Sequence, residues 1–176
     1  LFAKYKHAVV RIDLYYQGIG LSLGSGFFVS GDGHLVTNAH VIREFSITGI
    51  EIDISTFDGK VFTTKDIQVA SHGGGKSMDF SLLKIPFKPK SWINLDPAYE
   101  ASVGDQVIAI GHPQGLNYTL TNGLVSTHKI KKVRDRQGKE ISSFTQVQVS
   151  VPISPGNSGG PVLNMDGKLV AICTSI

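Results

Sequence analysis

The stretch Ser154-Pro155-Gly156-Asn157-Ser158-Gly159-Gly160-Pro161 places one serine between glycines on both sides. Glycine has no Cβ, so the chain can turn sharply around Ser158 and another backbone can approach it closely. Such a turn can aim successive backbone N–H groups into one space, which is what acyl transfer requires, because negative charge develops on the carbonyl oxygen in the transition state. Taken alone, the stretch is equally compatible with an ordinary Gly/Ser/Pro turn between two strands.

Two distant segments carry residues that could act together with Ser158. His40 lies near the end of the segment Leu35–Val41, and Asp79 opens the apolar part of Met78–Ile85. Histidine, aspartate and serine in this chain order are typical of peptidases of the chymotrypsin type. For His40 or Asp79 alone, a role in the core or in a turn would be the default interpretation.

The residues around all three positions resemble the signature segments of trypsin-like serine peptidases. These segments are Thr37–Val41, Asp79–Ile85 and Gly156–Pro161. Within that family the chain is most similar to the HtrA/Deg branch, from about residue 8 to the end. Further similar blocks are Gly24–Phe27, Gly111–Leu116 and Asn122–Ser126. The joint occurrence of the three segments therefore favours a catalytic role for His40, Asp79 and Ser158.

The resemblance implies a serine endopeptidase that works through an acyl-enzyme and uses neither a cofactor nor a metal. In it, Ser158 is the nucleophile, His40 is the general base, and Asp79 orients the imidazole. The N–H groups of Gly156 and Ser158 are expected to form the oxyanion hole. Positions matched to substrate-binding residues of the family are Pro152, Ile153, Ser154, Thr174, Ser175 and Ile176.

Specificity can be predicted from the residues just before the nucleophile, which line the primary pocket in this family. None of Pro152, Ile153 and Ser154 is acidic. We therefore expect cleavage of protein or peptide substrates after small-to-medium apolar residues rather than after Lys or Arg. At the end of the chain, the hydroxyl of Thr174 is expected to bond to Asp79, because a buried carboxylate that lacks donors is costly.

The chain departs from the HtrA pattern at several positions. Ser150 stands where the family usually has Asp, and Cys173 stands where it often has Asn. No PDZ domain follows within these residues, and the sequence ends at Ile176, before an expected further loop and last strand of the second barrel. HtrA relatives are often trimers and are periplasmic or secreted, so the resemblance makes a homotrimer and that location possibilities for this chain.

The expected fold class is all-β, because short β-rich runs alternate with turns in a chain of 176 residues that has 20 glycines and 7 prolines. The resemblance implies two antiparallel β-barrels of the trypsin type with the active site between them. The proline-rich segment Pro86–Trp92 is interpreted as the linker. We expect residues 1–88 to form the N-terminal barrel, which carries His40 and Asp79, and residues 89–176 to form the C-terminal barrel, which carries Ser158. The strands are expected at 8–16, 24–30, 35–36, 51–57, 61–71, 80–85, 106–111, 123–133, 144–151, 160–163 and 168–176.

Composition and charge argue against several other classes of protein. The net charge is +3, but six of the 17 basic residues lie between Lys129 and Glu140, so no broad basic face for nucleic acid is predicted. This segment is interpreted as a solvated loop, with a regulatory or partner-docking role as the alternative. No apolar stretch is long enough to span a membrane, and the opening residues do not resemble a signal peptide.

Weaker motifs are given ordinary structural interpretations. Ala70–Ser77 approaches a phosphate-binding loop, but a strand-like run follows it where a helix would be needed. The histidines lack metal-ligand spacing, and His112 is interpreted as a loop residue beside Pro113. Cys173, the one cysteine, cannot form an internal disulfide and lies in an apolar run, so a packed thiol is expected.

Three other functions remain open on the sequence. The first is a degenerate peptidase fold that serves as a protein-binding module, although intact triad positions argue against it. The second is a peptidase that is latent in this form. The third is a relative of the glutamyl endopeptidases, which share Gly156–Gly159 but often have serine where this chain has Gly160.

Overall fold

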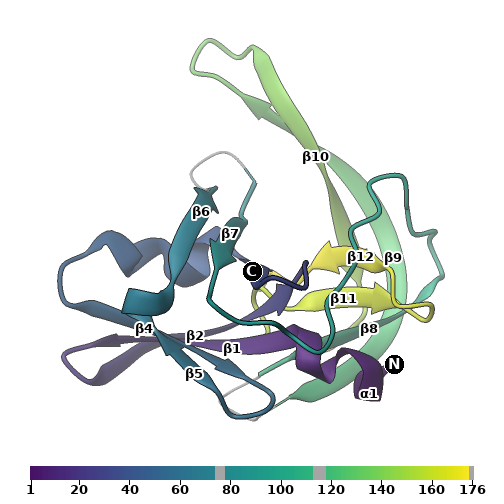
Figure 1. Ribbon diagram of the computed structural model, residues 1–176. Coiled ribbons are helices and arrows are strands. Elements are labelled where there is room, and N and C mark those ends of the chain that lie inside the picture. Colours follow the sequence, from purple (N-terminus) through teal and green to yellow (C-terminus); the bar gives the residue numbers. More distant parts are fainter. Residues whose placement is uncertain (74–77, 113–117, 175–176) are drawn as a thin grey trace.

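The structure, a computed structural model, describes residues 1–73, 78–112 and 118–174. It is built almost entirely of antiparallel strands, which form two curled sheets (Figure 1). In the described residues the helices are short: α1 (Phe2–Tyr5), η1 (Lys6–Ala8), η2 (Ala39–Ser46) and η3 (Thr64–Asp66). This architecture confirms the predicted all-β class. No helix among the described residues has the length and apolar character needed to cross a membrane.

The first sheet has seven strands in the order β5-β4-β1-β2-β3-β7-β6, all from the first half of the chain. The strands are β1 (Val9–Tyr16), β2 (Ile19–Phe28), β3 (His34–Thr37), β4 (Ile50–Thr56), β5 (Val61–Thr63), β6 (Gln68–His72) and β7 (Ser81–Lys84). In β4 the side chains alternate: Ile50, Ile52 and Ile54 are buried, and the residues between them are exposed or half-buried.

The second sheet has five strands in the order β10-β9-β8-β11-β12. The strands are β8 (Gln106–Gly111), β9 (Thr119–Arg134), β10 (Glu140–Val149), β11 (Pro161–Asn164) and β12 (Leu169–Ile172). The two sheets thus separate between β7 and β8, on either side of the segment interpreted as a linker. That separation is the structural basis for the proposed division at residues 88 and 89.

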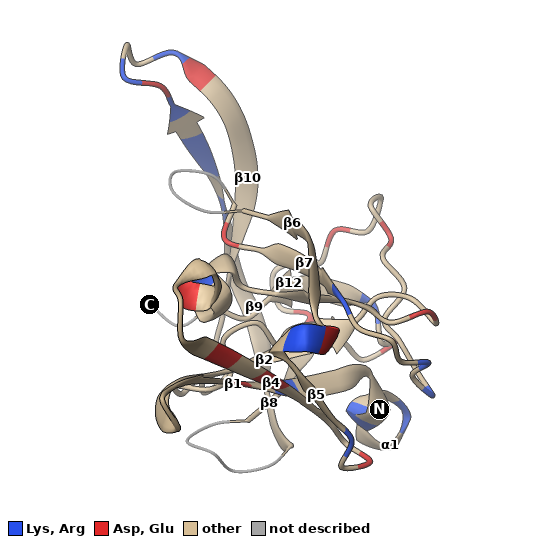
Figure 2. Cartoon of the chain, turned by 60° about the vertical axis from the view of Figure 1, so that its left-hand side comes forward, with Lys and Arg blue, Asp and Glu red and all other residues tan. Residues whose placement is uncertain are grey.

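The long hairpin of β9 and β10 projects away from the rest of the molecule (Figure 1). Its outer part carries the charged segment Lys129–Glu140, with basic residues on both sides of the tip (Figure 2). The exposed residues there include the apolar Ile130 and Ile141. The ion pair between Lys132 and Glu140 also lies on the surface, so this part of the hairpin is solvated, as the sequence predicts.

A shared hydrophobic cluster joins the two sheets. It contains Val9 and Phe27 from the first sheet together with Ile108, Ile110 and Leu163 from the second, and each of them is at least 96% buried. Burial of such side chains is worth about 2 kcal/mol each. The sheets are therefore held against each other by a continuous apolar contact.

One predicted strand is wrong. Residues 61–71 do not form a single strand, because the 3₁₀ turn η3 divides them into β5 and β6. Thr63 begins this turn in a capping box, in which its N–H donates to Asp66 Oδ2 at 3.0 Å. The capping residues satisfy the backbone locally, so the chain leaves the ladder there.

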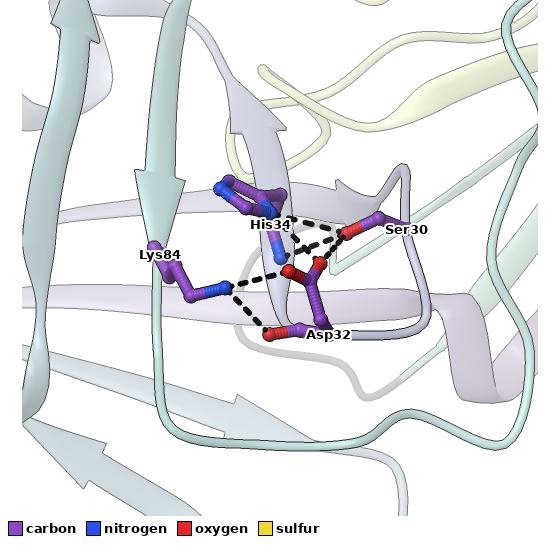
Figure 3. A network of polar contacts seen from close by, with 4 residues as sticks. All are labelled: Ser30, Asp32, His34 and Lys84. Atoms are coloured by element: carbon purple, nitrogen blue, oxygen red, sulfur yellow. Dashed lines mark hydrogen bonds and ion pairs between the residues drawn. The ribbon is translucent and has the colours of Figure 1, made fainter.

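The turn at Gly31-Asp32-Gly33 between β2 and β3 is held by a polar network at the surface (Figure 3). Asp32 accepts from Ser30, from Lys84 Nζ of β7 at 2.8 Å, and pairs with His34 Nδ1 at 2.8 Å. The hydrogen bond from Lys84, followed by those from Ser30 and His34, holds the pKa of the Asp32 carboxyl well below its usual range. Ser30 Oγ also lies 3.3 Å from His34 Nδ1 and accepts the backbone N–H of His34 at 3.2 Å. Asp32 binds both the hydroxyl and that ring nitrogen, so the network holds the turn together.

Candidate active site

His40 and Asp79 form the best-defined polar pair of the site. Asp79 Oδ2 lies 2.6 Å from His40 Nδ1, and Asp79 Oδ1 accepts the backbone N–H of His40 at 2.9 Å. Both carboxylate oxygens thus bind one residue, which fixes the imidazole relative to its own backbone. A proton on Nδ1 is then held by the carboxylate, and Nε2 is left as the basic nitrogen.

Pro155 and Gly156 form the centre of a type II turn. The N–H of Asn157 donates to Ser154 O at 3.0 Å, and Gly156 has φ +101°, which a type II turn requires at this position. A Cβ on Gly156 would lie 2.1 Å from His112 O, so only glycine fits. Within the described residues, no hydrogen bond uses the Gly156 N–H, and it is therefore available to an oxyanion.

The loop of Ser158 packs directly against the segment that carries His40. A Cβ on Gly159, which has φ +87°, would lie 3.1 Å from Asn38 N, two residues before His40. On the other side, Gly24 of β2 lies between Val41 and Ser158 O, and a Cβ there would meet them at 2.5 and 3.3 Å. Asp79 lies in the same region, because both of its carboxylate oxygens are hydrogen-bonded to His40. The structure thus brings together the three segments predicted to carry a triad.

Thr174 contacts Asn38 and not the carboxylate of Asp79. Asn38 Nδ2 donates to Thr174 Oγ1 at 3.1 Å and to the backbone O of Asp79 at 2.8 Å. The expected bond from Thr174 to the Asp79 side chain is not found among the described residues, and that prediction is wrong. The Asp79 side chain is 38% exposed, so it is not the buried, donor-poor carboxylate that the prediction assumed.

The other predicted substrate-binding residues lie in three situations. Pro152 and Ile153 are exposed, and Ser154 is half-buried at the start of the type II turn. Ser175 and Ile176 lie outside the described residues, as does most of the phosphate-loop-like segment. Their contacts with a peptide therefore remain predictions.

Cys173 is buried, as predicted, and supports the nucleophile loop through its backbone. Its N–H donates to Gly160 O and its C=O accepts from Gly159 N, both at 2.8 Å. Burial raises the pKa of the Cys173 thiol to about 11, so the sulfur stays protonated at neutral pH. This confirms a packed thiol rather than a second nucleophile.

Two residues near the nucleophile were not assigned a role by the sequence. Ser25 Oγ donates to Gly156 O at 2.7 Å, and the N–H of His112 donates to Ser25 Oγ at 3.2 Å. His112 does follow β8 as a loop residue, but its side chain is wholly buried. The available signal was the presence of both residues in the glycine-containing blocks 24–27 and 111–116. Their partners are 131 and 87 residues away, and no local pattern predicts such pairs.

The burial of His112 leads to a prediction about stability and pH. Burial, and secondarily the charge of Arg11, lower the pKa of His112 to about 4. Between the unfolded value of about 6.5 and that value, the unfolded chain binds a proton that the folded chain does not. Stability should therefore fall as the pH is lowered through this range, by about 2 to 3 kcal/mol for this one group.

Urea unfolding at pH 7 and at pH 4.5 measures this effect. In a His112→Asn variant, whose side chain cannot take up the proton, the difference between the two pH values should shrink by about 2 kcal/mol. A His128→Asn variant changes an exposed histidine and should leave the difference as it is in the unaltered protein. An unchanged pH difference in His112→Asn would contradict the assignment of a neutral buried imidazole.

No group of three or more His, Cys, Asp or Glu side chains in the described part of the chain could hold a metal ion. The groups that this arrangement offers for chemistry are His40, Asp79, Ser158 and the backbone donors.

Comparison with known proteins agrees with this geometry. Residues 24–172 match the family model described as a trypsin-like peptidase domain. Over 155 residues, covering 88% of this chain, the sequence is 37% identical to a probable periplasmic serine endoprotease, DegP-like, of Hahella chejuensis. Over 154 residues, 87% of this chain, it is 35% identical to a protein with the same description from Chlamydia muridarum.

The fold is also similar to a solved structure of an HtrA-type protease with a tripeptide. The TM-score is 0.76 at 28% sequence identity, and the match covers 99% of this chain and 53% of that one. The chain spans 30% of the Hahella relative and 28% of the Chlamydia relative.

Proposed function

Because the chain belongs to the family of trypsin-like peptidase domains, we propose that it hydrolyses peptide bonds through an acyl-enzyme formed on Ser158. The observation that carries this proposal is the bidentate hold of Asp79 on His40, next to the glycine-rich loop of Ser158. Binding alone does not require an imidazole fixed with Nε2 as a base, whereas a serine nucleophile does.

In the proposed reaction, His40 Nε2 removes the proton of Ser158 Oγ as this oxygen attacks the substrate carbonyl. The resulting oxyanion is stabilised by the N–H groups of Gly156 and Ser158, each worth about 3 kcal/mol. His40 then gives the proton to the leaving amine, and a water molecule, activated by the same nitrogen, releases the acid product. Asp79 stays ionised and stabilises the imidazolium in both steps.

The proposed substrates are protein segments in an extended, at least partly unfolded, form. The Hahella and Chlamydia relatives are described as probable periplasmic serine endoproteases, and this chain is proposed to act in the same compartment. The N–H of Gly156 lies in a turn beside the exposed Pro152–Ile153 segment. The substrate residue before the cleaved bond is proposed to bind at this segment.

Cleavage of a mixed peptide library tests the proposed function and specificity together. We expect cuts after Val, Ile, Ala and Leu at least about tenfold more often than after Lys or Arg, because no acidic residue lies at 152–154 to pair with a buried cation. A Ser158→Ala protein prepared in parallel identifies any cuts made by a contaminating peptidase. A dominant cut after Lys or Arg that is lost in Ser158→Ala would contradict the specificity, and no serine-dependent cut at all would contradict the function.

A further inference from the structure

Ser25 in β2 is hydrogen-bonded to both residues whose N–H groups are proposed as oxyanion donors. Its N–H donates to Ser158 O at 2.7 Å, and its hydroxyl donates to Gly156 O at 2.7 Å. Its carbonyl accepts from Thr37 Oγ1 at 2.7 Å, which ties the same residue to the strand before His40. Ser25 is wholly buried, so water does not compete for the donors and acceptors of these hydrogen bonds.

The hydrogen-bond geometry determines where the protons lie between Ser25 and His112. A carbonyl can only accept, so the single hydroxyl proton of Ser25 lies in the bond to Gly156 O. Towards His112 Nδ1, 3.1 Å away, Ser25 Oγ can therefore only accept, and Nδ1 must carry the ring proton. The remaining lone pair of Oγ accepts the backbone N–H of His112 at 3.2 Å. The hydroxyl then has all the partners that it can take.

This tautomer leaves His112 Nε2 without a proton. Nε2 is buried and has no hydrogen-bond partner among the described residues. The ring packs edge-to-face with Tyr118, with 4.3 Å between the ring centroids. Burying the Nε2 acceptor without a donor costs free energy. The hydrogen bond that the buried imidazole does make with its ring is the one from Nδ1–H to Ser25 Oγ.

We propose that Ser25 and His112 are positioning residues that hold Gly156 and Ser158 in the arrangement needed for oxyanion stabilisation. The inference rests on the proposed function, because only acyl transfer uses these two donors. The hydroxyl of Ser25 fixes the carbonyl of Gly156, and the backbone N–H of Ser25 fixes the carbonyl of Ser158. A single residue of β2 therefore positions both oxyanion donors. His112 acts through Ser25 by orienting its hydroxyl towards Gly156.

The contacts around Gly156 show why such support is needed. Glycine is required at this position because His112 O would lie 2.1 Å from a Cβ, yet glycine is also the residue with the greatest backbone freedom. The turn hydrogen bond from Asn157 to Ser154 closes the turn but connects it to nothing else. Among the described residues, the hydrogen bond from Ser25 ties Gly156 to β2 of the first sheet.

Steady-state kinetics of four variants test the proposal. We expect Ser25→Ala and His112→Leu to lower kcat by about 10- to 100-fold with KM changed less than about threefold, because oxyanion donors act in the transition state and not on the bound substrate. His112→Asn places an amide N–H where Nδ1–H lies and should recover kcat to within about threefold. Ser22→Ala, in the same strand, is the matched control and should leave both constants unchanged.

Rates must be expressed per folded molecule, so that a loss of stability is not mistaken for a loss of positioning. A raised KM at constant kcat in Ser25→Ala would overturn the proposal, as would equal losses in His112→Asn and His112→Leu. If Ser25 and His112 had a purely structural role, Ser25→Ala, His112→Leu and His112→Asn would lower the stability of the protein and leave kcat unchanged.

Two NMR measurements decide the proposal without any turnover. In the unaltered protein, the His112 ring should show a slowly exchanging proton on Nδ1 and a bare Nε2. In Ser25→Ala, the amides of Asn157 and Gly160 should exchange at least about tenfold faster, while the core amide of Ile54 reports any change in global stability. A proton on Nε2, or unchanged exchange at Asn157 and Gly160, would refute the positioning role. If these results are as expected but the unaltered protein cleaves no peptide, the proposed function fails and the positioning of the turn stands.

Discussion

Ser158→Ala is expected to lower kcat for a peptide substrate by about 10⁶-fold, because the covalent route through the acyl-enzyme is lost altogether. The fold should be retained. The interaction by which residue 158 joins β2 is made by its backbone carbonyl, which accepts from Ser25 N at 2.7 Å and is unaffected by the substitution. Hydrolysis of a fluorogenic peptide, with circular dichroism of the same sample, measures both parts of this expectation.

Ser142→Ala is the matched control for this variant, since Ser142 lies exposed on β10. It should retain full activity. If Ser158→Ala kept more than about one thousandth of the activity, the residual rate would exceed what the oxyanion donors and binding alone supply, and Ser158 would not be the nucleophile.

Asp79→Asn is expected to lower kcat by about 10⁴-fold through the wrong imidazole tautomer. The backbone N–H of His40 is a fixed donor 2.9 Å from Oδ1, so the amide oxygen of an asparagine would be drawn to it. The amide NH₂ would then face His40 Nδ1, which would have to accept, and the ring proton would move to Nε2. In that form His40 cannot take the proton of Ser158.

The kinetic pattern separates this effect from a general loss of structure. KM should stay within about threefold and the urea midpoint close to that of the unaltered protein, because the hydrogen bonds are exchanged and not removed. Asp166→Asn, in the turn between β11 and β12, is the control and should be fully active. Full activity in Asp79→Asn would show that Asp79 does not orient the base.

Much of the site could be predicted because its signals are local. Pro155 and Gly156 specify a type II turn by themselves, since proline presets φ at the second position and glycine allows a positive φ at the third. The turn at Asp32, which lies between two glycines, and the alternation in β4 likewise depend on local residue patterns. The family resemblance then placed three distant segments together, and the structure brings those segments together.

The parts that were missed depend on tertiary environment. The division of 61–71 followed from the capping of η3, which competes with a strand pattern that looked continuous. The expected bond between Thr174 and Asp79 assumed a buried carboxylate, and exposure cannot be read from a signature segment. The partnership of Ser25 with Gly156 spans 131 residues and exists only once the sheets have packed.

Covalent labelling with a fluorophosphonate probe tests the central claim most directly, since only a serine activated by a base reacts rapidly with it. We predict that the folded protein takes up one label, that peptide mapping places it on Ser158, and that labelling is lost in Ser158→Ala and strongly slowed in Asp79→Asn. A folded protein that takes up no label, or that carries it on another serine at an unchanged rate in Ser158→Ala, would contradict the account.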